Sequence, residues 1–207
     1  MINSYRSLHR NHAQQLIVTV SKHYYVTKNN VLKYQAKPFE TKLTNLSESN
    51  KTNVIITSIR DHWSGMFYAE ISTGPNLPSL TDFLQRAWSP KSDLPFCGIP
   101  VFMSLPRTVE ALYPSLPTAI ENLGIKLFSV TSGFQGGVRD IRTIESNLAV
   151  YQGRPIEDAK TWLYKTCVIH ACEKGRNEKN TKAEMWQLSD YELRFPPSGW
   201  ARVADGK

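Results

Sequence analysis

The chain has 207 residues, of which 41% are hydrophobic and 21% charged; this composition is that of an ordinary globular protein and excludes a disordered tail or a fibre. A chain of this length can bury one good core with a flanking extension. The formal net charge of +7 and the pI near 9.3 indicate an anionic partner, with nucleic acid the first candidate. A solvated basic surface is the alternative explanation of the charge.

The cysteines and the hydropathy indicate where such a protein works. Cys97, Cys167 and Cys172 form neither a metal-ligand spacing nor an even disulfide framework, so we expect a reducing, cytoplasmic location. No apolar run approaches the length of a membrane span, and no signal peptide is evident at the N-terminus. We therefore expect no membrane partner.

Residues 1–35 are predicted to form a basic N-terminal arm. The positive charge is concentrated in this part of the chain, since residues 1–42 hold seven lysines and arginines and a single acid. The segment 4–20 is predicted to be helical, because its apolar residues repeat at roughly helical spacing. A turn is expected at residues 28–30 and a short extended piece at residues 31–34.

The middle of the chain reads as an α/β unit. Three successive extended segments are expected at residues 38–46, 52–60 and 65–73, joined by short polar connections as antiparallel hairpins require. The later segments alternate between helix and strand: a helix at 79–88 capped by Ser79 or Thr81, a buried strand at 99–103, a helix interrupted by prolines at 108–123, a strand at 125–130, and a long helix from Pro155.

This order of segments resembles the catalytic core of a retroviral-type integrase or insertion-element transposase, of the ribonuclease-H-like superfamily. Two local sequences add to the resemblance: the turn Asp61-His62-Trp63-Ser64-Gly65, and Ile144-Glu145-Ser146-Asn147, which is expected to open a helix after a glycine-bearing loop. The resemblance implies an α/β, ribonuclease-H-like fold with a mixed five-stranded sheet flanked by helices. We expect an integrase-core-like domain at 36–182, preceded by the basic arm and followed by a C-terminal helical extension and a tail at 183–207.

The same resemblance implies a site of three acids. Integrases and related transposases hold two divalent ions on three carboxylates, which supply the hard oxygen ligands that magnesium prefers. The first acid sits within the first strand, just before a Thr-containing pair of residues, and Lys42 occupies that place in Lys42-Leu43-Thr44. The second acid follows the fourth strand, where Pro106 stands and no neighbour is acidic. The third matches Glu145. The resemblance therefore implies a degenerate, inactive integrase-like domain without a metal cofactor.

Asp61 is the strongest argument against inactivity. It ends an apolar strand 84 positions before Glu145, which suits a first acid. The favoured interpretation is a turn residue between the second and third strands, where an aspartate binds nearby backbone amides. The alternative is an active magnesium-dependent strand transferase with a rearranged site on Asp61 and Glu145, completed for instance by Asp140.

Basic side chains supply the remaining chemistry. Six of them are the predicted DNA contacts, since lysines and arginines neutralise phosphates: Lys174, Arg176, Lys179, Lys182, Arg107 and Arg142. Glu173 and Glu178 dilute the cluster after the long helix, so a solvated helix end is the alternative there. His170 is predicted to be a packed histidine rather than a catalytic base.

The predicted function is nucleic-acid binding in DNA integration or recombination by a protein of a mobile element. A protein-interaction module without nucleic acid is the alternative from a different class. In that case Trp88, Trp162 and Tyr164 are candidates for contacts in a homodimer, although aromatic residues are more often part of the core.

Overall fold

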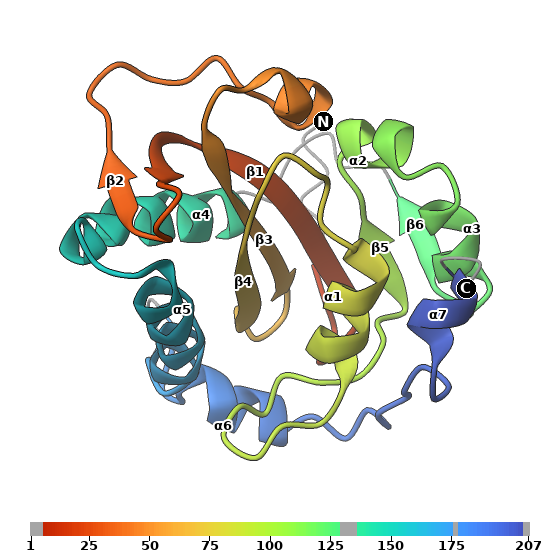
Figure 1. The fold of residues 1–207 in the computed structure, drawn as a ribbon. Coiled ribbons are helices and arrows are strands. Elements are labelled where there is room, and N and C mark those ends of the chain that lie inside the picture. The colour runs from red at the N-terminus through yellow and green to blue at the C-terminus, as the bar shows by residue number, and fades with distance from the viewer. Residues whose placement is uncertain (1–5, 129–135, 176–177, 205–207) are drawn as a thin grey trace, which may run out of the picture.

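The computed structural model describes residues 6–128, 136–175 and 178–204. A mixed sheet lies at its centre, with helices around it (Figure 1). The strands are β1 (Ala13–Val26), β2 (Leu32–Tyr34), β3 (Thr52–Asp61), β4 (Phe67–Thr73), β5 (Phe102–Ser104) and β6 (Lys126–Phe128). Their order is β4-β3-β1-β5-β6, with β2 paired to β1. The pairs β1–β3 and β3–β4 are antiparallel, whereas β5 and β6 run parallel to β1. The predicted mixed α/β sheet is confirmed, with six strands where five were expected.

The central strand is β1, and it comes from the segment that was expected to be helical. Buried and less buried side chains alternate over residues 14–20, with Leu16, Val18 and Val20 buried on one face, and its β-branched residues favour the extended state. Leu16 and Val20 are four residues apart, a spacing that fits both a helix and a strand. The helix predicted over residues 4–20 is therefore wrong.

The strand predicted over residues 38–46 is also wrong. This segment is irregular up to a 3-10 helix, η1 (Leu43–Glu48), whose Leu43 and Leu46 are buried. Lys42 precedes that helix, and its backbone N–H donates to Asn45 Oδ1 at 2.6 Å. Because β1 fills the centre of the sheet between β3 and β5, it is the first strand of the fold. Lys42 therefore does not occupy the place of the first acid.

The hairpin that follows β1 agrees with the expectation. Residues 28–30 form a turn, in which Asn30 has a φ of 57°, and β2 follows at once. Residues 13–34 of the expected N-terminal arm thus belong to the sheet, while the domain limits themselves stay a prediction.

The described helices are α1 (Leu80–Trp88), α2 (Arg107–Leu112), α3 (Leu116–Glu121), α4 (Gly136–Asn147), α5 (Ile156–Ala171), α6 (Lys182–Gln187) and α7 (Trp200–Ala204), with a 3-10 turn η2 (Leu148–Tyr151). The cap at Ser79 is confirmed, since its side chain accepts from the Asp82 N–H. The helix interrupted by prolines is also confirmed, as α2 and α3. Glu145, however, lies near the end of α4 and not at its start, because the helix already begins at Gly136.

Helices cover both faces of the sheet. On one face, α1 reaches β1 through Trp88, whose Nε1–H donates to Gln14 Oε1 at 2.9 Å. On the other face α4 packs against β1 and β3, and α5 packs against β4. The C-terminal segment also packs on the core, since the Trp200 ring lies 5.4 Å from that of Trp88. None of the helices in the described ranges has the length and apolar character needed to cross a bilayer.

Candidate functional site

The first turn of α4 lies unusually close to the sheet. A Cβ atom on Gly137 would sit 2.6 Å from Ile17 Cδ1 and 2.8 Å from Gln15 Oε1. A Cβ on Gly136 would sit 2.6 Å from Arg60 Nε. Two successive glycines therefore let the helix approach β1 and β3 in a way that larger residues would prevent.

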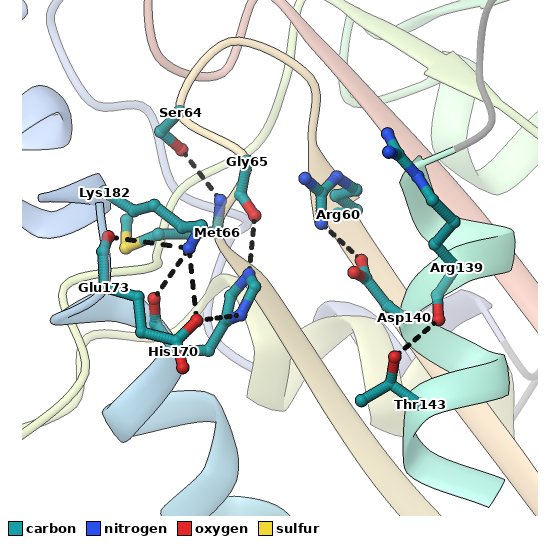
Figure 2. Close-up of polar contacts among 10 residues, drawn as sticks. All are labelled: Arg60, Ser64, Gly65, Met66, Arg139, Asp140, Thr143, His170, Glu173 and Lys182. Atoms are coloured by element: carbon teal, nitrogen blue, oxygen red, sulfur yellow. Dashed lines mark hydrogen bonds and ion pairs between the residues drawn. The ribbon is translucent and has the colours of Figure 1, made fainter. Parts of the chain in front are cut away.

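An ion pair joins α4 to the sheet. The Arg60 guanidinium, from β3, contacts the Asp140 carboxylate of α4 at 2.5 Å (Figure 2). The two side chains are only 19% and 10% exposed. A charge-assisted pair in such a place is strong and largely shielded from solvent. The Asp140 carboxylate, near the start of α4, is therefore neutralised from within the protein.

The true first strand changes which residues stand at the positions of the three acids. In β1 the Thr-containing pair is Val18-Thr19, so the resemblance places the first acid at Ile17. Gln15 pairs with Ser104 of the parallel strand β5, and Ile17 and Pro106 each follow that pair by two residues. Ile17 thus lies within β1, whereas Pro106 lies past the end of β5 and directly precedes α2. Glu145, which the resemblance matches to the third acid, lies near the end of α4, and Asp140 is the acid nearer the start of that helix.

Asp61 lies in the turn between β3 and β4 and is fully buried. Its Oδ1 accepts from the Asn11 N–H at 2.9 Å, and its Oδ2 accepts from the Ser64 N–H and hydroxyl, both at 2.7 Å. Burial raises the pKa of Asp61 to about 6, although these hydrogen bonds and nearby Arg60 act in the opposite direction. These contacts are those of an aspartate that supports a turn.

Glu145 lies at the other end of β1. Its Oε1 accepts from the Ser21 hydroxyl at 2.7 Å and from the Lys22 N–H at 2.8 Å. Asp61 is opposite Gln14, so seven residues of β1 separate the two acids, or about 20 Å of extended strand. The structure does not bring Asp61 and Glu145 together. Within the described ranges, no three His, Cys, Asp or Glu side chains gather in a way that could hold a metal ion.

A cavity of about 320 Å³ lies between α4 and α5, and Asp140, His170 and Glu173 are among its lining residues. The His170 ring lies 4.6 Å from the Phe67 ring, with Nε2 3.2 Å from the Gly65 carbonyl oxygen and Nδ1 3.2 Å from Glu173 Oε2. Burial, followed by the charge of Lys182, lowers the pKa of His170. These contacts hold His170 as part of the packing between α5 and β4.

The predicted DNA contacts fall in different surroundings. Lys182 is only 8% exposed, and its Nζ donates to the His170 and Glu173 carbonyl oxygens at 3.3 and 3.5 Å (Figure 2). Arg107, Arg142, Lys174 and Lys179 are exposed, on α2, on α4 and in the connection between α5 and α6. Arg176 lies outside the described residues.

The aromatic candidates for a homodimer contact also differ. Trp88 is fully buried, so it cannot reach a second copy. Trp162 and Tyr164 pack partly against the core, and the Tyr164 hydroxyl donates to Asp93.

Sequence reasoning missed Arg60, which decides the electrostatics of this site. Its one signal is a positive charge near the end of an otherwise apolar strand. The partner, Asp140, is 80 positions away, and nothing in the local pattern of either residue indicates the other.

Comparison with known proteins gives a structural match but no match in sequence. No protein-family model matches the chain, and no curated protein matches it. The HTLV-2 integrase catalytic core domain in complex with magnesium, in its trimeric form, aligns with a TM-score of 0.52 and 16% identity, over 87% of this chain and 99% of that chain.

Two further structures align with lower scores. The dimeric form of the same domain gives 0.46 at 16% identity, over 87% and 99% of the two chains. The simian T-cell lymphotropic virus intasome in complex with PP2A regulatory subunit B56 gamma gives 0.48 at 14% identity, over 93% and 61%. TM-scores of 0.46 and 0.48 are too low to add evidence. Sequence identities of 14% and 16% are evidence for the fold alone. On the first of these alignments and on the strand order, the chain has the ribonuclease-H-like fold of a retroviral integrase catalytic core.

Proposed function

We propose that this chain is an integrase-like protein of a mobile element, that it binds DNA during integration or recombination, and that it does not itself catalyse strand transfer. The observation that carries the proposal is the ion pair between Arg60 and Asp140. It puts a guanidinium beside Asp140, the acid that would be needed to complete a rearranged metal site.

The residues at the first two acid positions, together with Asp140, do not fit a pair of magnesium ions. Two-metal catalysis needs hard oxygen ligands that converge on both ions. Ile17 is aliphatic and Pro106 has no side-chain oxygen, while the Asp140 carboxylate already bonds to Arg60. A guanidinium this close would also repel an entering divalent cation. No catalytic step through a metal follows from these residues.

Electrostatics support the DNA-binding half of the proposal. The chain carries a net charge of +7, and four of the predicted contacts, Arg107, Arg142, Lys174 and Lys179, are exposed. Exposed cations of this kind neutralise phosphates and release counterions, which gives binding that tolerates different sequences and weakens with salt. A homodimer stays a prediction.

The test is a pair of assays on the same protein. Fluorescence anisotropy with duplex DNA should show binding at low salt whose affinity falls linearly with salt on logarithmic axes. A nicking and joining assay with magnesium or manganese should show no turnover. The absence of binding at low salt would contradict the first half of the proposal. Metal-dependent turnover that Asp140→Asn abolishes would contradict the second half.

A further inference from the structure

A second surface lies at the other end of α4, beside the hairpin of β1 and β2. There a hollow of about 400 Å³ is lined by side chains from the hairpin and from α4: His23, Tyr24, Tyr34, Arg142, Glu145 and Ser146. None of these residues takes part in the ion pair of Arg60 and Asp140. The hollow is therefore separate from the site at the start of α4.

Aromatic rings form the hairpin side of the hollow. The rings of His23 and Tyr34 are stacked, with centroids 5.6 Å apart and planes inclined by 22°. His23 Nδ1 lies 3.1 Å from the Gln35 carbonyl oxygen, which fixes the histidine ring. Tyr34 packs on the buried Tyr24 beneath it, at 5.5 Å, yet is itself 44% exposed. The stack is thus ordered in advance and presents ring surface to solvent.

One cation lies beside these rings. Arg142 lines the hollow and is exposed. Of the described side chains that line the hollow, Glu145 alone is acidic, and its Oε1 already accepts two hydrogen bonds from Ser21 and Lys22. Arg142 therefore supplies an exposed positive charge next to the rings.

We infer that this hairpin surface, made of His23, Tyr34 and Arg142, binds single-stranded nucleic acid by stacking an unpaired base on the two rings and contacting a phosphate with the guanidinium. Exposed rings with cations around them are the combination that binds single strands, because every base has a π-face and every nucleotide a phosphate. Bases within a duplex are already stacked on one another and cannot use such rings. The inference rests on the proposed function, since it names the surface and the form of nucleic acid.

The experiment measures binding of a labelled oligothymidylate of about 12 nucleotides by fluorescence anisotropy, with a duplex of the same length beside it. Tyr34→Ala and His23→Ala should each weaken binding of the single strand about 5- to 100-fold, the range measured for loss of one stacked base. Tyr34→Phe, which keeps the ring, should bind as the wild type does. Duplex binding should be unchanged in all three variants.

A matched control is available in the same chain. His9 and Tyr191 form another His–Tyr stack, with centroids 3.9 Å apart and planes inclined by 12°, near the start of β1. Tyr191→Ala removes a ring of the same type and should leave binding of the single strand unchanged. Thermal unfolding of each variant shows whether it is folded, and each alanine variant, Tyr34→Ala or His23→Ala, decides the test by itself if the other is not folded.

The outcomes separate this inference from the proposed function. Wild-type binding of the single strand that is indifferent to Tyr34→Ala and His23→Ala would overturn the inference and leave the proposed function standing. Binding of neither strand form at low salt would overturn both. An oligodeoxyuridylate and an oligouridylate of equal length, which differ only in the sugar, distinguish the two sources of single strand: preference for one sugar assigns the surface to DNA or to RNA, and equal binding supports recognition of the base alone.

Discussion

The two ends of α4 treat charge in opposite ways. Near its start, Asp140 is 10% exposed and held by Arg60, and nearby Asp61 has no exposed surface. At the last turn, Glu145 bonds to Ser21 and the chain around it presents Arg142 and Tyr34 to solvent. The charges near the start of the helix are neutralised internally, whereas the other end has charges and rings available to a partner.

This difference shows that acids on one helix can meet different surroundings. The ion pair of Arg60 and Asp140 attaches α4 to β3 within the protein, whereas residues near Glu145 are exposed and available for contacts outside it. Four measurements test the comparison.

The largest effect is expected from Arg60→Ala. Asp140 would keep its charge in a largely buried place without a partner, and we expect a loss of about 3 kcal/mol or more in the free energy of unfolding. The matched control is Arg86→Ala, which breaks an ion pair with Glu70 whose side chains are 54% and 27% exposed and should cost about 1 kcal/mol or less. Urea denaturation at neutral pH measures both. Equal losses of unfolding free energy would mean that the ion pair of Arg60 and Asp140 is no better shielded from solvent than the exposed pair of Arg86 and Glu70.

The pH dependence of Asp61 comes next. Its pKa rises from 3.8 to about 6 on folding, so the folded state keeps a proton that the unfolded state has already lost within that window. The contribution of Asp61 to the free energy of unfolding is therefore complete below pH 3.8. It decreases by at most about 3 kcal/mol as the pH rises to about 6.

Other groups titrate in the same window, and a variant separates them from Asp61. Burial lowers the pKa values of His12, His62 and His170. Their contribution to the free energy of unfolding therefore decreases as the pH falls. We therefore compare wild type with Asp61→Asn across the window by urea denaturation. The stability advantage of the wild type should narrow as the pH rises, and a constant gap would show that Asp61 stays ionised when buried.

A smaller effect is expected from Glu145→Gln. The carboxylate accepts two hydrogen bonds, so its loss should cost about 1–2 kcal/mol in the free energy of unfolding. Ser21→Ala should cost a similar amount. The double variant should lose less unfolding free energy than the sum of the two single losses. Manganese titration by calorimetry should be identical for wild type and Glu145→Gln. A metal-binding signal lost in the variant would mean that this end of α4 holds an ion after all.

The smallest effect concerns salt. Arg142→Ala should reduce the slope of the logarithm of the DNA-binding constant against the logarithm of salt by about one, since one phosphate contact is lost. Lys182→Met removes a lysine that is 8% exposed and should leave that slope unchanged. Anisotropy titrations at several salt concentrations measure it. A change in slope with Lys182→Met would contradict the expectation that the buried lysine makes no phosphate contact while the exposed Arg142 makes one.

Local signals predicted most of the later elements correctly. Ser79 with Asp82 indicates a helix start, and Pro114 with Pro117 indicates the break between α2 and α3, because capping and loss of a backbone N–H depend on adjacent residues alone. The central strand was missed, since Leu16 and Val20 suit both periods and only pairing with β3 and β5 selects the extended state. Because β1 was predicted to be a helix, the position of the first acid was assigned to Lys42 instead of Ile17.

The sequence by itself indicated the α/β class of the fold, through the alternation of apolar segments after residue 50, and an excess of positive charge, through its lysines and arginines. It also determined the glycines that let α4 approach the sheet. Only the tertiary structure decided which acids are near which cations. Arg60 and Asp140 are 80 positions apart, and Glu145 and Ser21 are 124 apart. Contacts at such separations follow from strand register and helix packing, which no local pattern encodes.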